Sequence, residues 1–153
     1  MNKTAYVGIK YHPDNRNRDL IEGLSAALED VGIGSRVVVR DVERWGEISM
    51  APSQLMAEAL ELIRDSDIVA IEASEKGVGL GIEAGYAHAH SIPVVVIHRE
   101  GKELSPTLVG IATDVIQHRS ERDLSPVAAR ILEMVGSDES PSSATQRSSR
   151  KGD

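Results

Sequence analysis

Short runs of β-branched residues alternate along the chain with segments of helical spacing, and this alternation restricts the range of folds more than any other feature. Five runs have β character, at residues 4–9, 35–40, 67–72, 93–98 and 113–117. Most are nearly continuous in Val and Ile, which is typical of a parallel strand covered on both faces. We therefore expect five parallel strands.

Four other segments place their apolar residues on one helical face. They span residues 18–31, 52–64, 81–90 and 124–135. In the first of them Leu20, Leu24 and Leu28 share a stripe, and Gly32 then provides a helix stop. Alternating strands and helices with short connections predict a doubly wound α/β sheet of the flavodoxin-like kind, with helices on both faces.

Length and composition fit one domain. The chain has 153 residues, of which 41% are hydrophobic, and this is enough for a single core. From residue 137 onward the sequence is rich in Ser and its only aliphatic residue is Ala144, so it cannot bury enough surface to offset its ordering entropy. We predict a folded domain at residues 1–136 and a disordered tail at residues 137–153.

Charge and residue usage exclude several classes of function. The chain has 24 acidic and 17 basic residues, and a net charge of -7 opposes binding to polymeric DNA or RNA. It has no cysteine, which excludes disulfide scaffolds and thiolate metal sites. We see no signal-peptide pattern and no apolar run long enough for a membrane span, and we expect a cytoplasmic protein with no membrane partner.

A glycine-rich segment, residues 74–87, follows the third predicted strand and reads SEKGVGLGIEAGYA. Ligands of doubly wound sheets bind at the carboxyl ends of the strands, where this segment begins. Its glycines let backbone N–H groups approach a ligand, and the helix N-terminus favours an anion. The spacing differs from the dinucleotide fingerprint GxGxxG, so the segment indicates a ligand site and leaves the ligand open.

Glu83 stands beside these glycines, and we place it in the first turn of the helix that follows. There the helix dipole and nearby N–H donors stabilise the ionised carboxylate. An ionised carboxylate in a cleft can attack a glycosidic carbon or stabilise an oxocarbenium-like centre. The residue alone is equally compatible with an ordinary first-turn glutamate, which helices favour for the same electrostatic reason.

The pattern GxGxExGxA is matched without a gap at Gly79, Gly81, Glu83, Gly85 and Ala87. It resembles the nucleoside 2-deoxyribosyltransferase family, and within that family the chain is most similar to the 2'-deoxynucleoside 5'-phosphate N-hydrolases. The resemblance implies that Glu83 is the catalytic carboxylate that attacks the anomeric carbon.

The same resemblance implies further residues around the sugar and the phosphate. Tyr6, at the first strand, matches an active-site tyrosine and would be the hydrogen-bond partner of the catalytic glutamate. The backbone of Gly79 and Gly81 would line the sugar site, and Gly77, which stands where the family has a serine, is a further substrate-binding candidate. Ser105 matches a serine that the family supplies from a neighbouring subunit near the 5'-phosphate, and the family also implies a homodimer.

Three more residues are candidates for substrate binding, each with a plainer alternative. His12 and Arg18 supply positive charge for a phosphate, or belong to a solvated loop. Trp45 follows the second strand, where the family contacts the base, and a lone Trp in a polar loop either stacks a heterocycle or anchors the loop on the domain.

The most serious departure from the family pattern is on the second predicted helix. Ala59 stands where the resemblance implies an aspartate that positions or protonates the substrate, and alanine can do neither. Another acid has taken over, or the substrate differs, or catalysis is weak or absent. The candidate acids are Asp14, Asp41 and Glu43.

We expect no metal and no cofactor. His88 and His90 diverge by about 200° on a helix, whereas helical ligand pairs sit four residues apart. The resulting hypothesis is an N-glycosidase or deoxyribosyltransferase that acts on a small nucleoside or nucleoside 5'-monophosphate. The alternative is a non-catalytic nucleotide-binding module that keeps the pocket and lacks the acid at Ala59.

Overall fold

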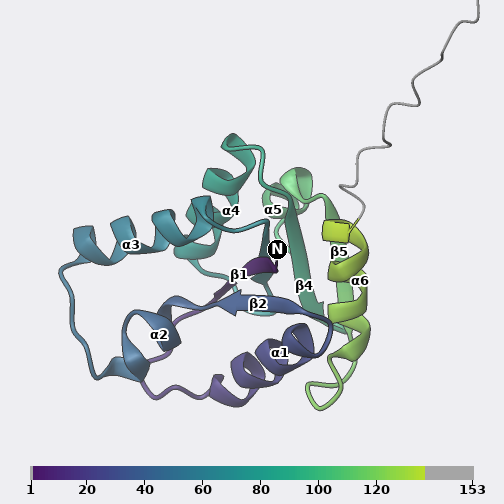
Figure 1. Ribbon diagram of the computed structural model, residues 1–153, viewed down its shortest axis with the longest axis horizontal. Helices are drawn as coiled ribbons and strands as arrows, with labels where there is room; N and C mark the ends of the chain where they lie inside the picture. Colours follow the sequence, from purple (N-terminus) through teal and green to yellow (C-terminus); the bar gives the residue numbers. More distant parts are fainter. Residues whose placement is uncertain (1, 137–153) are drawn as a thin grey trace, which may run out of the picture.

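A computed structural model describes residues 2–136 and shows five strands in one sheet, with helices on both faces (Figure 1). The strands are β1 (Lys3–Ile9), β2 (Ile33–Arg36), β3 (Ile68–Glu72), β4 (Val94–Arg99) and β5 (Asp114–His118). Their order is β2-β1-β3-β4-β5, and every neighbouring pair is parallel. This is the flavodoxin-like order, so the predicted fold class is confirmed.

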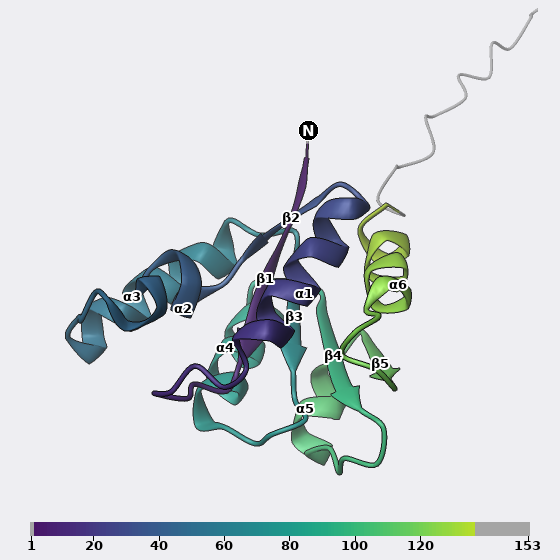
Figure 2. The ribbon, with the colours of Figure 1, turned by 90° about the horizontal axis from the view of Figure 1, so that it is seen from below.

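The helices divide between the two faces of the sheet. They are α1 (Arg18–Asp30), α2 (Val38–Asp41), α3 (Pro52–Arg64), α4 (Val78–Ala89), α5 (Pro106–Ile111) and α6 (Ser125–Gly136), with a 3-10 turn η1 (Arg44–Gly46) after α2. One core cluster joins α1 and α6 to the sheet, and these two helices lie side by side in Figure 2. A second cluster joins α3, α4 and α5 to the opposite face.

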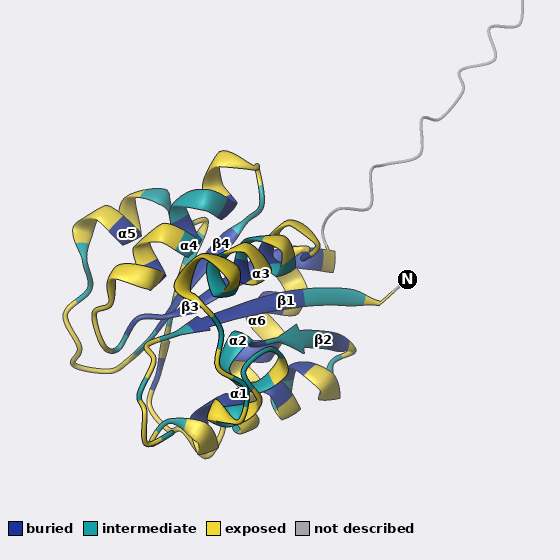
Figure 3. Cartoon of the chain, turned by 90° about the vertical axis from the view of Figure 1, so that its left-hand side faces the viewer, coloured by how far each residue is buried: buried dark blue, intermediate teal, exposed yellow. Residues whose placement is uncertain are grey.

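Strand β1 contributes side chains to both clusters because successive residues of a strand point to opposite faces. Ala5 and Val7 pack in the α1 and α6 cluster, whereas Tyr6 packs in the α3, α4 and α5 cluster. Figure 3 shows the buried centre of β1 beneath α3 and α4. Because of this alternation, Tyr6 and Gly8 lie on the face of the sheet that α4 covers.

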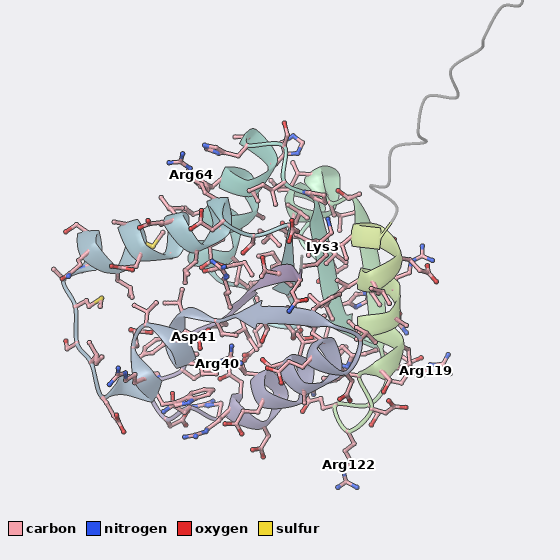
Figure 4. The ribbon with its side chains drawn as sticks, in the orientation of Figure 1. Lys3, Arg40, Asp41, Arg64, Arg119 and Arg122 are labelled. Carbon is pink, nitrogen blue, oxygen red and sulfur yellow. The ribbon has the colours of Figure 1, made fainter. Side chains whose placement is uncertain are left out.

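The prediction for the second strand is wrong. The run at residues 35–40 was expected to be extended, but β2 ends at Arg36 and residues 38–41 form α2. Strand β2 is an edge strand, and Asp41 turns the chain back because its Oδ2 accepts a hydrogen bond from the backbone N–H of Val37 at 2.8 Å. Arg40 pairs with Asp41 on the same short helix (Figure 4) and donates to the Ser35 carbonyl at 2.8 Å. These local hydrogen bonds outweigh the β propensity of the valines.

The third predicted helix begins earlier than expected. Helix α4 starts at Val78, so Gly79 and Gly81 lie inside its first turn and Glu83 lies in the second. Helix α5 was not predicted, because six residues carry too little periodicity to be recognised. The remaining strands and helices agree with the prediction to within one or two residues.

Within residues 2–136, each helix is too short or too polar to cross a bilayer. The predicted tail at residues 137–153 lies outside the described part of the chain.

Candidate active site

A cavity of about 520 Å³ opens at the carboxyl end of β1. Its lining comes from residues 6–12 of β1 and the loop after it, from the segment that follows β2, from α3, and from the start of α4. Strand β1 is flanked by β2 on one side and β3 on the other, which makes it the point where the strand order reverses. Doubly wound sheets bind ligands at this point, so the cavity is the candidate active site.

Tyr6 and Glu83 meet in this cavity. The hydroxyl of Tyr6 donates a hydrogen bond to Oε1 of Glu83, with the two oxygens 2.8 Å apart. The pair joins β1 to the second turn of α4, and both residues line the cavity. Tyr6 itself is only 1% exposed, so its ring is held by the core while its hydroxyl reaches the carboxylate.

Burial raises the pKa of Glu83 to about 7, and the hydrogen bond from Tyr6 only partly offsets this rise. The prediction that the start of the helix keeps the carboxylate ionised is therefore wrong. The dipole effect is confined to the first turn, and Glu83 lies one turn further on and largely out of water.

Tyr6 acts on Glu83 as a donor. Burial raises the pKa of the Tyr6 phenol well above its ordinary value, and the charge of Glu83 and the shared hydrogen bond raise it further. The phenol therefore keeps its proton at every physiological pH and offers it to the carboxylate.

Gly8 is a residue that the sequence reasoning missed. A Cβ at this position would lie 2.5 Å from Oε2 of Glu83 and 2.7 Å from Cδ1 of Ile71, so any side chain would displace the carboxylate. Among the described residues, this buried Oε2 has no hydrogen-bond partner. A lone glycine inside a β run marks a close approach of the backbone to another group, and that signal was present in the sequence.

His12 lies at the same cavity and is paired with a carboxylate. Its Nε2 is 2.6 Å from Oε2 of Glu75, and the His12 ring is mostly covered whereas Glu75 is half exposed. The hydrogen bond to His12 is the main reason why the pKa of Glu75 is lowered. This contact holds the imidazole ring in place beside the cavity.

The structure brings together only some of the other predicted site residues. Gly77 and Gly79 line the cavity with Glu83. Gly81 and Ser105 instead line a neighbouring cavity of about 430 Å³ between α4 and α5. Of the two residues predicted to bind a phosphate, His12 lines the main cavity and Arg18 does not.

Trp45 and Arg18 stack on each other away from the cavity lining. The Arg18 guanidinium lies 4.4 Å from the centre of the Trp45 ring, which also packs against the core cluster of α1 and α6. Asn15 Nδ2 donates to the Trp45 carbonyl at 3.0 Å. These contacts favour the loop-anchor alternative for Trp45 over stacking on a base.

The position of the missing acid is at the cavity. Ala59, on α3, lines it and is only 2% exposed. Of the three candidate replacements, Asp14 pairs with Arg16 and Asp41 with Arg40, both away from the lining. Glu43 does line the cavity, and burial raises the pKa of its carboxyl.

The described residues contain no group of three or more metal-ligating side chains, His, Cys, Asp or Glu, that lie close enough to hold a metal ion. His88 and His90 are exposed at the end of α4, where Nδ1 of His90 contacts the Tyr86 carbonyl at 2.9 Å.

Comparison with known proteins finds neither a matching family model nor a matching curated protein. Solved structures do match. A conserved protein from Enterococcus faecalis V583 has 19% identity and a TM-score of 0.64, over 86% of this chain and 100% of that one. The CMP N-glycosidase BcmB from Clostridium botulinum has 18% identity and a TM-score of 0.63, over 85% and 100%.

A 2-deoxyribosyltransferase from Bacillus psychrosaccharolyticus has 13% identity and a TM-score of 0.61, over 80% of this chain and 90% of that one. Identities this low establish a shared fold, and function has to be argued from the site. The chain thus shares its fold with a CMP N-glycosidase and a 2-deoxyribosyltransferase, in agreement with the resemblance drawn from the motif at residues 79–87.

Proposed function

We propose that the protein cleaves the N-glycosidic bond of a nucleoside or nucleoside 5'-monophosphate, with Glu83 as the nucleophile. The observation that carries the proposal is the Tyr6–Glu83 pair in a cavity of about 520 Å³. A carboxylate that accepts one hydrogen bond and is otherwise shielded from water is poorly solvated and therefore reactive. The volume is in the range of small-molecule sites.

The chemistry follows from this geometry. The ionised carboxylate of Glu83 attacks C1' of the sugar, and the bond from C1' to the base nitrogen breaks with its electron pair on the base. A covalent glycosyl-enzyme forms, and water then attacks C1' and releases the sugar and the free carboxylate. A second base in place of water gives transfer. Tyr6 orients the attacking group and supports its ionised form.

The substrate class is supported by the lining and by the fold neighbours. Residues 37–39 with Leu55 and Met56 give the cavity an apolar side suited to a base, and Lys10 and His12 provide nitrogen donors suited to a phosphate. Two proteins that share the fold are a CMP N-glycosidase and a 2-deoxyribosyltransferase. We assign Gly77 and Gly79 to the sugar.

We also propose that two copies of the chain associate through α4 and α5. Val78, Ile82 and Val109 on these helices are 84%, 50% and 40% exposed, which is unusual for neighbouring large apolar residues. Ser105 and Gly81 lie in the cavity between the two helices, where a second copy would meet them. Light scattering on the purified protein tests this, and a monomer at all concentrations would contradict it.

We place the protein in the cytoplasm because it has no cysteine.

A non-catalytic nucleotide-binding module is the second candidate. Ala59 favours it, because the α3 side of the cavity has no acid where the motif resemblance implies one. Such a module would bind a nucleotide saturably and release no base.

Incubation with nucleosides and nucleoside 5'-monophosphates of both sugars, followed by chromatography for free base, separates the candidates. We expect base release by the wild-type protein and none by Glu83→Gln. The matched control is Glu58→Gln, at an exposed position on α3. Full activity in Glu83→Gln would contradict the role of the nucleophile, and binding without release would favour the module.

A further inference from the structure

Two carboxyl groups face one cavity from opposite sides. Of the described residues that line it, only Glu83 and Glu43 carry a carboxyl group. Glu83 comes from α4, which follows β3, whereas Glu43 comes from the end of the segment that follows β2. Strand β1 runs between β2 and β3, and Figure 3 shows α4 and α2 on either side of it. A ligand over the end of β1 would therefore lie between the two acids.

The Glu43 side chain has no structural task that explains its position. The side chain is partly buried, and among residues 2–136 it forms no hydrogen bond and no ion pair. Other acids nearby are paired, as Asp41 is with Arg40. The neighbouring lining at residues 37–39 is entirely valine, and the partial burial of Glu43 raises the pKa of its carboxyl. An unpaired carboxyl beside apolar side chains in a cavity is free to contact a ligand.

The turn that follows Glu43 is strained, whereas Glu43 itself has ordinary helical backbone angles. Its N–H donates to the Val38 carbonyl and its carbonyl accepts from Gly46, both at 3.0 Å. The next three residues all have positive φ, at 46° for Arg44, 57° for Trp45 and 96° for Gly46. Two of them are not glycine, and side chains rarely adopt this conformation. Strain of this kind persists at functional sites when the surroundings impose it.

The contacts of Trp45 impose the strained turn at residues 44–46. The ring packs on the core, Arg18 covers it, and Asn15 binds its carbonyl. The stack of Trp45 and Arg18 is not part of the cavity lining, and it fixes the turn that follows Glu43.

We propose that Glu43 is the acid that takes the place of the one missing at Ala59, and that it protonates the nucleobase as the base leaves. The inference rests on the proposed function. In the first step Glu83 forms its bond to C1', the bond from C1' to the base breaks, and the proton of the Glu43 carboxyl moves to the base. In the second step water attacks C1', its proton moves to the Glu43 carboxylate, and Glu83 is released. The sum is nucleoside plus water to free base plus sugar.

Other groups at the cavity are less suited to this step. The proton of Tyr6 is engaged with Glu83, and the His12 ring is bound to Glu75. Burial already raises the pKa of Glu43, and a base that covers it removes it further from water, which favours the protonated form needed in an acid.

The test compares Glu43→Gln with Glu47→Gln, an exposed glutamate in the same turn that does not line the cavity. Each variant is assayed on the best natural substrate and on the 4-nitrophenyl glycoside of the same sugar, whose leaving group departs without a proton. We expect Glu43→Gln to lose about 100-fold or more in kcat/KM on the nucleotide and less than about 5-fold in kcat/KM on the nitrophenyl glycoside. The ratio kcat/KM reports the first step, in which the nitrophenyl group needs no proton. Glu47→Gln should match the wild-type protein on both.

Each other outcome overturns the inference. If Glu43→Gln loses the same factor in kcat/KM on both substrates, Glu43 has a structural role. If the variant keeps full activity on the nucleotide, Glu43 has no role in the reaction. In both cases the proposed function stands, provided that Glu83→Gln is inactive on both substrates. If the wild-type protein releases no base at all, the proposed function fails and the role of Glu43 fails with it. Thermal unfolding of Glu43→Gln at the wild-type temperature excludes misfolding as the cause of a loss.

Discussion

The hydroxyl of Tyr6 donates a 2.8 Å hydrogen bond to Oε1 of Glu83 across 77 positions of the chain. The bond links the centre of β1 to the second turn of α4 and so places a buried donor and a buried acid at one end of the cavity. It is also what limits the rise in the pKa of Glu83 that burial causes.

Activity on a 4-nitrophenyl glycoside should rise with pH through about 7. Glu83 attacks as the carboxylate, and burial raises its pKa to about 7, so the reactive form accumulates only above that pH. On a 4-nitrophenyl glycoside no proton donor is needed, and kcat/KM then reports the ionisation of Glu83 alone. A pH profile of kcat/KM on this substrate measures the pKa of Glu83. An acid limb near 4.5, the ordinary value, would contradict the burial of this group.

Tyr6→Phe should move that acid limb to higher pH. The hydrogen bond from Tyr6 lowers the pKa of Glu83, so its removal raises the pKa further and reduces the ionised fraction at pH 7. The ring remains in the core, so folding should be little affected. Tyr86→Phe, outside the cavity lining, is the control. An unchanged limb in Tyr6→Phe would show that the hydrogen bond has no electrostatic effect.

Glu83→Gln should stabilise the fold at high pH. The unfolded chain loses the Glu83 proton near 4.5 and the folded chain only near 7, so the wild-type protein loses stability as pH rises through this window. At pH 8 the variant avoids a cost on the order of 3 kcal/mol, and the advantage disappears at pH 4. Urea unfolding at both pH values measures the difference. Glu58→Gln, which is exposed, should show no such dependence on pH.

Gly8→Ala should impair both folding and activity. The added Cβ would lie 2.5 Å from Oε2 of Glu83, so the carboxylate or the strand must shift, at a cost of about 1–3 kcal/mol. Gly34→Ala in β2 is the matched control, since its Cβ would meet nothing closer than 3.7 Å. Urea unfolding and base release are measured for both. If Gly8→Ala behaves like Gly34→Ala, the close approach of Gly8 to Glu83 is not a constraint.

Several elements could be predicted because their signals are local. The Ile-Val-Ala-Ile run of β3 is completely buried, as a continuous apolar run in a parallel sheet should be. Helix α3 spans residues 52–64 as expected, because its apolar stripe and the proline at its start are both written in neighbouring residues. Glu83 could be proposed as a candidate for the same reason, since the glycines around it form a contiguous motif.

The failures concern residues whose state depends on distant partners. Val38 and Val39 read as a strand, but β2 is an edge strand and the hydrogen bond from Val37 to Asp41 ends it early. For Trp45 the sequence left base stacking and a loop anchor open, and only the contacts with Arg18 and the core favour the loop anchor. The sequence did not anticipate the raised pKa of Glu83, because its burial depends on β1 and on the packing of α4, which no local pattern records.

The amino-acid sequence by itself determined the order of strands and helices, the sheet type and the glycine-rich segment that carries Glu83, because periodicity and motif spacing act within a few residues. Only the tertiary structure decided which side chains share the cavity. It joined Tyr6 to Glu83, placed Gly8 beneath the carboxylate and turned Glu43 rather than Asp14 or Asp41 toward the same space. Burial and proximity between distant segments set these relations, and they exist only once the sheet has assembled.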